Sequence, residues 1–161
     1  MNETMLTVKT ALVAFFTLLG SLLGWKGIMI VVWVVAMALD YISGTCAAVK
    51  AKSWCSQTAR QGLWHKGGMI LVVCVAAIAD GIIVVIGDHL PLGLSWPGLI
   101  LPLVLAWYII TELGSILENA VKMGANVPEW FVRILKIGLK AVNEAGETAA
   151  GETEDDFHKE E

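Results

Sequence analysis

Charged residues are scarce in this sequence, and that scarcity excludes an ordinary soluble domain. Only 16% of the 161 residues are charged, whereas 57% are hydrophobic and the mean hydropathy is +0.70. Soluble domains are typically about 25% charged and about 45–50% apolar. The composition therefore predicts an all-α, polytopic integral membrane protein.

Motifs for catalysis and for metal binding are missing as well. The sequence contains no P-loop, nucleophile elbow, H-E-x-x-H pair or Gly-rich dinucleotide loop. Its three cysteines are an odd number without a C-x-x-C pair, which argues against a disulfide framework and against a zinc site. The three histidines have no second ligand at a useful spacing. We therefore expect no enzyme activity, no metal or other cofactor, and no nucleic-acid partner.

Four apolar stretches are present, and each has the roughly 20 residues that a membrane-spanning helix needs. They cover residues 5–25, 27–49, 67–87 and 97–121. The first stretch has two interpretations: it spans the membrane, as we favour from its charge-free run, or it lies in the interface. It carries no A-x-A cleavage site, so it is not predicted to be a signal peptide. Residues 1–127 are thus predicted to form a transmembrane domain of three to four helices.

Residues 128–143 have the pattern of an amphipathic helix, with apolar side chains on one face and three cations on the other. The cations are Arg133, Lys136 and Lys140. We favour a position on the anionic inner leaflet, and the alternative is packing against another helix of the protein. The last stretch, residues 144–161, holds eight acids against one lysine and is predicted to be a disordered tail.

The distribution of Lys and Arg predicts the orientation in the membrane. Residues 50–66 contain four cations and no acid, whereas residues 88–96 contain no cation. Because Lys and Arg accumulate on the cytoplasmic side, we expect residues 50–66 and the C-terminus to face the cytoplasm. The cations predicted to lie at the membrane surface are Lys50, Lys52, Arg60, Lys66, Arg133, Lys136 and Lys140.

Acidic residues inside the apolar stretches are the main functional candidates. A charge at the middle of a spanning helix costs at least about 2.5–3.5 kcal/mol, so it must face water, a partner or another helix. Counted along their helices, Asp40 and Glu112 should lie at similar depth in the inner part of the bilayer, and Asp80 nearer the outer face. The candidates for lining a pore or packing helices are Asp40, Ser43, Gly44, Asp80, Glu112, Ser115 and Asn119.

Two interpretations of these polar faces are open. In the first, the helices simply pack, with Asp40 or Glu112 paired to Lys50, Lys52 or Lys122. In the second, the faces line a water path or meet between subunits.

An ordered set of residues runs from the second apolar stretch to the amphipathic helix. It comprises Asp40, Tyr41, Ser43, Gly44, Lys50, Lys52, Arg60, Gly62, Lys66, Tyr108, Glu112, Ser115, Glu118, Asn119, Gly124 and Pro128. With the hydropathy between its parts, this set resembles the phage-lysis and toxin-secretion holin family of Firmicutes phages and clostridia. The resemblance covers roughly residues 25–135.

The resemblance implies a homo-oligomer in the cytoplasmic membrane of the bacterial host that opens lesions for an endolysin, or in some relatives for a toxin. The endolysin would be coupled functionally, without necessary direct contact. Two alternatives differ in class: a small channel or transporter, and a non-lytic partner of the antiholin type. Hydropathy and spacing by themselves support only a small, oligomer-prone helical membrane protein without a catalytic centre.

Overall fold

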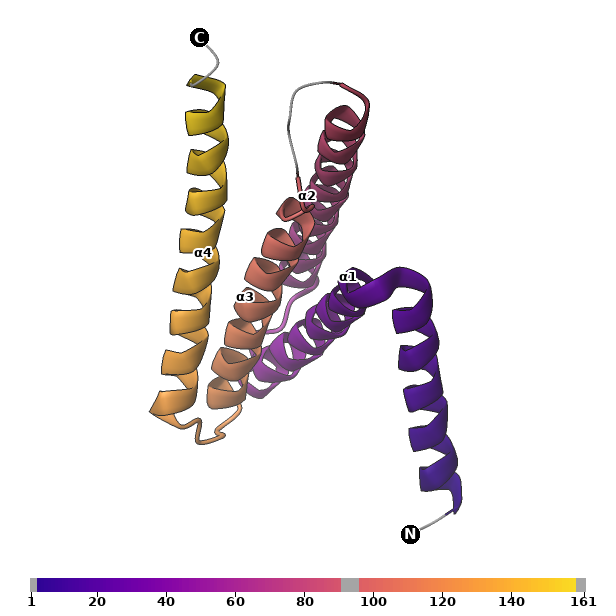
Figure 1. Cartoon of the computed structure of the whole chain (residues 1–161). Coiled ribbons are helices and arrows are strands. Elements are labelled where there is room, and N and C mark those ends of the chain that lie inside the picture. Colours follow the sequence, from indigo (N-terminus) through magenta and orange to yellow (C-terminus); the bar gives the residue numbers. More distant parts are fainter. Residues whose placement is uncertain (1–2, 91–95, 159–161) are drawn as a thin grey trace.

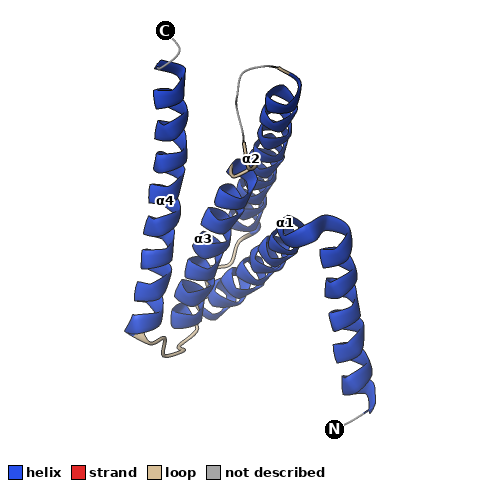
Figure 2. Cartoon of the chain, viewed as in Figure 1, coloured by secondary structure: helices blue, strands red, loops and turns tan. Residues whose placement is uncertain are grey.

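Four α-helices make up the computed structural model, which describes the backbone of residues 3–90 and 96–158 and side chains mainly in 24–57, 60–90 and 96–151. The helices are α1 (Glu3–Lys50), α2 (Ser56–His89), α3 (Ile100–Lys122) and α4 (Glu129–His158) (Figure 1). Over the described residues there is no strand (Figure 2). The prediction of an all-α protein is therefore confirmed.

A kink at Gly24 divides α1 into two arms (Figure 1). Gly24 has φ 64° and ψ −168°, a conformation that glycine adopts without the steric penalty of a Cβ atom. The break falls just before the end of the first predicted apolar stretch. Beyond it, Gly24–Lys50 joins the bundle, while the first arm points away (Figure 1). Whether residues 5–25 span the membrane stays a prediction, because most of their side chains lie outside the described residues.

Helix α3 is the centre of the bundle. It packs against α1, α2 and α4, whereas α1 and α2 barely touch each other. The buried core consists of Trp33 and Met37 of α1, Met69, Val73 and Ala76 of α2, and Leu101 and Leu105 of α3. Trp33 also stacks on Tyr108 of α3, with ring centroids 6.1 Å apart. Each outer helix is thus held in place through its contact with α3.

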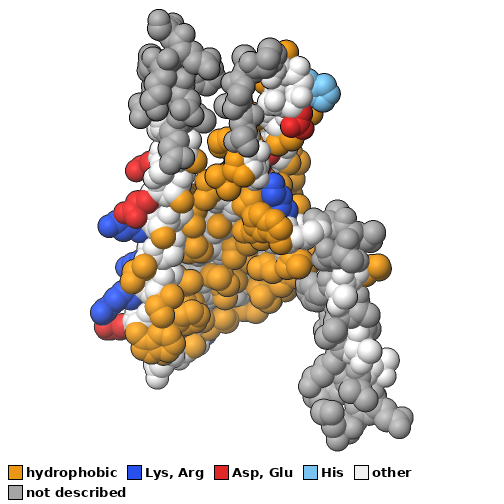
Figure 3. All heavy atoms as spheres, in the orientation of Figure 1, with side chains coloured by type: hydrophobic (Ala, Val, Ile, Leu, Met, Phe, Trp, Pro, Cys, Tyr) orange, Lys and Arg blue, Asp and Glu red, His pale blue; other side chains and the backbone are white. Residues whose placement is uncertain are grey.

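Three helices are long and apolar enough to cross a membrane: Gly24–Lys50, Arg60–His89 and Ile100–Lys122. The shortest, α3, has 23 residues and a length of about 35 Å, enough for the roughly 30 Å hydrocarbon core. Large apolar side chains cover the outside of the bundle, as the face in Figure 3 shows. Such a surface suits contact with lipid chains.

The connection between the first two spans is shorter than predicted. Residues 50–66 were expected to form a basic segment at the membrane surface, but α2 already begins at Ser56. Arg60 and Lys66 therefore lie on a helix, and only residues 51–55 separate α1 from α2. In the sequence, the charge of Lys66 marks the start of the apolar stretch 67–87. The helix nevertheless begins ten residues earlier, because a charge that has partners in the bundle does not interrupt a helix.

Helix α4 differs from two expectations. It continues as helix to His158, where residues 144–161 were predicted to be disordered. Ala and Glu, which are frequent after residue 143, favour helix, and the charge criterion for disorder ignored that propensity. Moreover, α4 packs along α3 (Figure 1). The favoured expectation was a position on the inner leaflet, and the packing seen here is the alternative.

Candidate functional site

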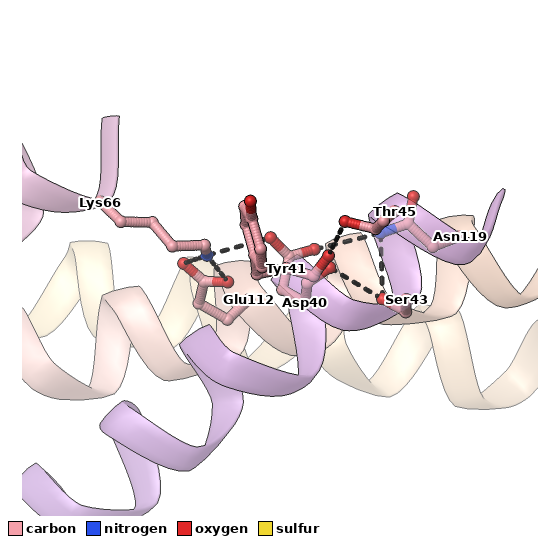
Figure 4. Close-up of polar contacts among 7 residues, drawn as sticks. All are labelled: Asp40, Tyr41, Ser43, Thr45, Lys66, Glu112 and Asn119. Carbon is pink, nitrogen blue, oxygen red and sulfur yellow. Dashed lines mark hydrogen bonds and ion pairs between the residues drawn. The ribbon is translucent and has the colours of Figure 1, made fainter. Parts of the chain in front are cut away.

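A buried ion-pair cluster joins the three spans at one level. Lys66 of α2 donates to both carboxylate oxygens of Glu112 in α3, at 2.8 and 2.7 Å. The same Nζ lies 3.0 Å from Oδ2 of Asp40 in α1 (Figure 4). Each residue lies ten positions from the same end of its helix, since α1 ends at Lys50, α2 begins at Ser56 and α3 ends at Lys122. Hence the three charges meet about 15 Å from the predicted cytoplasmic end.

Electrostatics make this cluster a structural unit. The side chain of Lys66 is only 12% exposed and that of Glu112 only 5%, so water screens their attraction poorly. Two carboxylates share one ammonium, which leaves one negative charge in excess. Removing one partner of a buried ion pair leaves an uncompensated charge and typically costs about 3–5 kcal/mol. We therefore regard the cluster as the main polar link between α2 and the other two spans.

Asn119 extends the cluster toward the C-terminal end of α3. Its Nδ2 donates to Oδ1 of Asp40 and to Oγ of Ser43, both at 3.1 Å (Figure 4). Gly44 permits this approach: a Cβ atom at position 44 would lie 3.4 Å from Nδ2 of Asn119. Small residues let membrane helices approach closely enough for such bonds. The polar stripe of α1 is therefore paired with α3 within one chain.

Asp80 works at the opposite end of the bundle. Oδ1 accepts hydrogen bonds from Nε1 of Trp96 at 2.8 Å and from the backbone N–H of Ile100 at 3.0 Å. Oδ2 accepts the backbone N–H of Leu101 at 2.9 Å. Leu99, at the N-cap of α3, has no side chain that could cap the helix. Asp80 of α2 thus supplies the cap and places its negative charge at the positive end of the helix dipole.

Two lysines fasten α1 to the ends of α3. Nζ of Lys26 donates to the carbonyl oxygen of Gly98 at 2.8 Å, just before α3. Nζ of Lys50 donates to the carbonyl oxygen of Met123, just after it. The second contact also suits the negative end of the helix dipole. Gly98 has φ +70°, and a Cβ atom there would come within 2.6 Å of Nζ of Lys26.

A groove of about 780 Å³ opens between α1, α2 and α3 beside the ion-pair cluster. It exists because α1 and α2 separate on either side of α3. Asp40, Lys66 and Glu112 form its polar wall, and Trp54 and Trp107 are among its apolar lining. The groove gives water limited access to Asp40, which is 20% exposed. The polar wall consists of charged groups and a hydrogen-bond donor, the ammonium of Lys66.

The structure unites most of the predicted polar candidates. Asp40 and Glu112 share one depth as predicted, and Ser43, Gly44 and Asn119 meet beside them. Ser115 lines the groove, and Asp80 lies apart. The contacts fit the helix-packing interpretation, whereas a role in lining a pore stays a prediction.

The predicted cationic partner of the acids was wrong. Neither Lys50, Lys52 nor Lys122 pairs with Asp40 or Glu112 among the described residues; Lys66 does. Counting ten residues from each helix end would have identified Lys66, had the start of α2 been placed correctly. The remaining predicted surface cations are exposed: Lys50, Lys52, Arg60, Arg133, Lys136 and Lys140.

Comparison with known proteins gives one family. The family model described as "Bacteriophage holin family" matches residues 17–139, which include all three candidate spans. An uncharacterized protein of Clostridium perfringens (strain 13 / Type A) is 30% identical over 84% of this chain and 93% of its own length. Another uncharacterized C. perfringens protein, of 14.9 kDa, is 30% identical over 80% of this chain and 90% of its own length.

A relative from another genus has a similar sequence identity to this chain. An uncharacterized protein of Listeria monocytogenes is 30% identical over 81% of this chain and 85% of its own length. No solved structure matches the chain significantly.

Proposed function

This chain belongs to the bacteriophage holin family, and we propose that it acts as a holin in the bacterial cytoplasmic membrane. Copies accumulate there, oligomerise and open lesions through which an endolysin reaches the cell wall. The observation that carries this proposal is the family match over residues 17–139. The family is not a family of enzymes, and the lesion itself would be the activity.

The distribution of polar groups supports association between copies. Three acids of the spans have partners inside one chain: Asp40 and Glu112 on Lys66, and Asp80 on the start of α3. The outside of the described bundle is rich in exposed apolar side chains. A single copy can therefore insert without offering water a path. A lesion then requires several copies, since three spans around a filled core enclose no channel.

We propose that the loop at residues 51–55 and the start of α4 face the cytoplasm. The support is the Lys and Arg around them and the absence of Lys and Arg from residues 88–96. The cargo would be an endolysin that needs no direct contact with the holin. Release of a toxin instead of an endolysin would use the same lesion.

A transporter with a path through Asp40, Asp80 and Glu112 has less support. Asp80 lies 14 residues from Lys66 along α2, or about 21 Å away. Its carboxylate is fully engaged by the start of α3. The ion-pair cluster and Asp80 are therefore two separate structural links.

The decisive experiment is inducible expression in a bacterium with and without a co-expressed endolysin, followed by culture turbidity. We expect turbidity to collapse after a delay only when both proteins are present. A catalytically inactive endolysin is the matched control and should leave turbidity unchanged. Growth that continues with both active proteins, although the chain is found in the membrane, would refute the proposed holin function. An antiholin is identified if the chain fails to lyse cells together with the active endolysin but delays lysis by a second holin.

A further inference from the structure

Helix α4 packs beside α3, which is one of the three candidate spans. A Cβ atom at Gly138 would lie 3.4 Å from Cδ1 of Ile110, the eleventh of the 23 residues of α3. Val132, Leu135 and Leu139 of α4 face α3 on either side of this point. With 30 residues, α4 is about 45 Å long, so it is as long as the membrane is thick.

One side of α4 is polar from Glu129 to Glu147. We call it the polar arc; its members are Glu129, Arg133, Lys136, Lys140, Asn143, Glu144 and Glu147, and all are exposed. Figure 3 shows these charged side chains along the edge of the molecule that α4 forms. The one ion pair among the described residues of the arc joins Lys140 and Glu144 at 3.4 Å, with both side chains more than 60% exposed.

A second, apolar side of α4 is also exposed. We call it the apolar flank; it contains Trp130, Ile134 and Ile137, which are 62%, 55% and 62% exposed. At 100° per residue, the flank lies between the polar arc and the face that packs on α3. Helix α4 therefore has three sides: one against α3, one apolar and exposed, and one charged.

Lipid is a poor environment for the polar arc. Lys140 lies two residues beyond Gly138, so it is close to the level of the middle of α3. A charged side chain that faces lipid at that depth is expensive, and the spans pair Asp40, Lys66 and Glu112 with one another inside the bundle. Arg133 and Lys136 form no ion pair with any described side chain. The position of α4 beside α3 is thus stable in a membrane only if the polar arc faces water.

We propose that α4 is the element that lines the aqueous lumen of the lesion. This inference rests on the proposed holin function. In the open assembly, each copy keeps α4 against its own α3, turns the polar arc toward the lumen and packs the apolar flank on a neighbouring copy. The ion-pair cluster of the spans stays inside each copy and does not contact the lumen.

The competing arrangement places α4 flat on the inner leaflet, which requires it to leave α3. A reversible cross-link between α3 and α4 distinguishes these two arrangements. We suggest Ile110→Cys with Gly138→Cys, in a chain whose Cys46, Cys55 and Cys74 are replaced by serine. A short bis-methanethiosulfonate reagent joins the two thiols, and a reductant reverses the link. Linked protein that migrates as a monomer on a gel carries the link within one copy.

Dye release from zwitterionic phospholipid liposomes measures the lesion. We expect the linked protein to release dye within about twofold of the unlinked protein, because the link holds the competent arrangement. A loss of about tenfold or more that reductant reverses would overturn the inference, because α4 would then have to leave α3. If the unlinked protein releases nothing, the holin function itself fails, and the inference fails with it.

Charge selectivity of the linked protein tests the lumen directly. Lys136→Glu with Lys140→Glu should lower the release of an anionic dye relative to a cationic dye of the same size, at low ionic strength. Lys52→Glu, an exposed cation in the connection between α1 and α2, is the matched control and should leave the ratio unchanged. An unchanged ratio in the double variant, with release intact, would overturn the assignment of the polar arc to the lumen.

Discussion

Replacing Lys66 tests the ion-pair cluster, because this lysine is the single cation between two carboxylates. Lys66→Met keeps the length and the apolar stem of the side chain but removes the ammonium. It deletes two bonds to Glu112 and the contact with Asp40, and it leaves two anions facing each other. We therefore expect α2 to separate from α1 and α3 at the level of the groove.

Two magnitudes compete for the size of this effect. A neutral polar contact between membrane helices averages only about 0.6 kcal/mol. Breaking one side of a buried ion pair costs about 3–5 kcal/mol. The second value applies here because Glu112 is only 4% exposed and Lys66→Met removes its ion-pair partner. We expect a loss of about 3–5 kcal/mol in the free energy of unfolding.

Unfolding by SDS in mixed micelles, followed by circular dichroism, measures that free energy. Arg60→Met is the matched control: it removes an exposed cation of the same helix and should cost less than about 1 kcal/mol. Lys66→Met combined with Asp40→Asn and Glu112→Gln should recover most of the loss, because no buried charge then lacks a partner. The reasoning fails if Lys66→Met is as stable as Arg60→Met, or if the triple variant is no more stable than Lys66→Met.

Three further predictions concern the ends of the bundle. Asp80→Ala should lower the free energy of unfolding by about 0.5–2 kcal/mol, because α3 loses its cap. In the same SDS titration, the control Asp88→Ala should change that free energy little, because Asp88 is exposed on the same helix. Gly98→Ala should cost about 1–3 kcal/mol, because φ +70° disfavours a Cβ atom that would also meet Lys26; stability equal to the parent would contradict this. Cys55, exposed in the connection between α1 and α2, should react with an impermeant maleimide in inverted vesicles and not in intact cells, and labelling in intact cells would reverse the predicted orientation.

The depth of the buried acids could be predicted from the sequence, but their partner could not. Asp40 and Glu112 follow long apolar runs, and a fixed rise per residue converts position into depth. Finding Lys66 required the start of α2, and the sequence signal there was ambiguous because a paired lysine and a surface lysine look alike. Pairing is a tertiary property that periodicity along one helix does not contain.

The cap at the start of α3 likewise could not be predicted from the sequence near it. A cap is normally sought within a few residues of the helix start, and Leu99 offers none. Asp80 supplies it from 20 residues earlier in the chain, so only the fold reveals the function of that acid. The prediction for the acidic stretch after residue 143 was wrong for a local reason, not a tertiary one. Its charge predicted disorder, while its alanines and glutamates continue the helix to His158.

The lysine contacts at the two ends of the Gly24–Lys50 arm of α1 also restrict how the bundle can move. Lys26 and Lys50 donate to carbonyl oxygens at opposite ends of α3, so a shift of α1 along α3 by one residue, about 1.5 Å, would strain both contacts at once. Shear between α1 and α3 is therefore suppressed, and these two helices translate and tilt together. Helix α2 is attached by the polar contacts of Lys66 and Asp80 and by its core packing on α3, and it has little contact with α1. Rotation of α2 about α3 is therefore expected to be the softest internal motion. Rearrangement within one copy should thus change the spacing between α1 and α2 while the pair of α1 and α3 keeps its register.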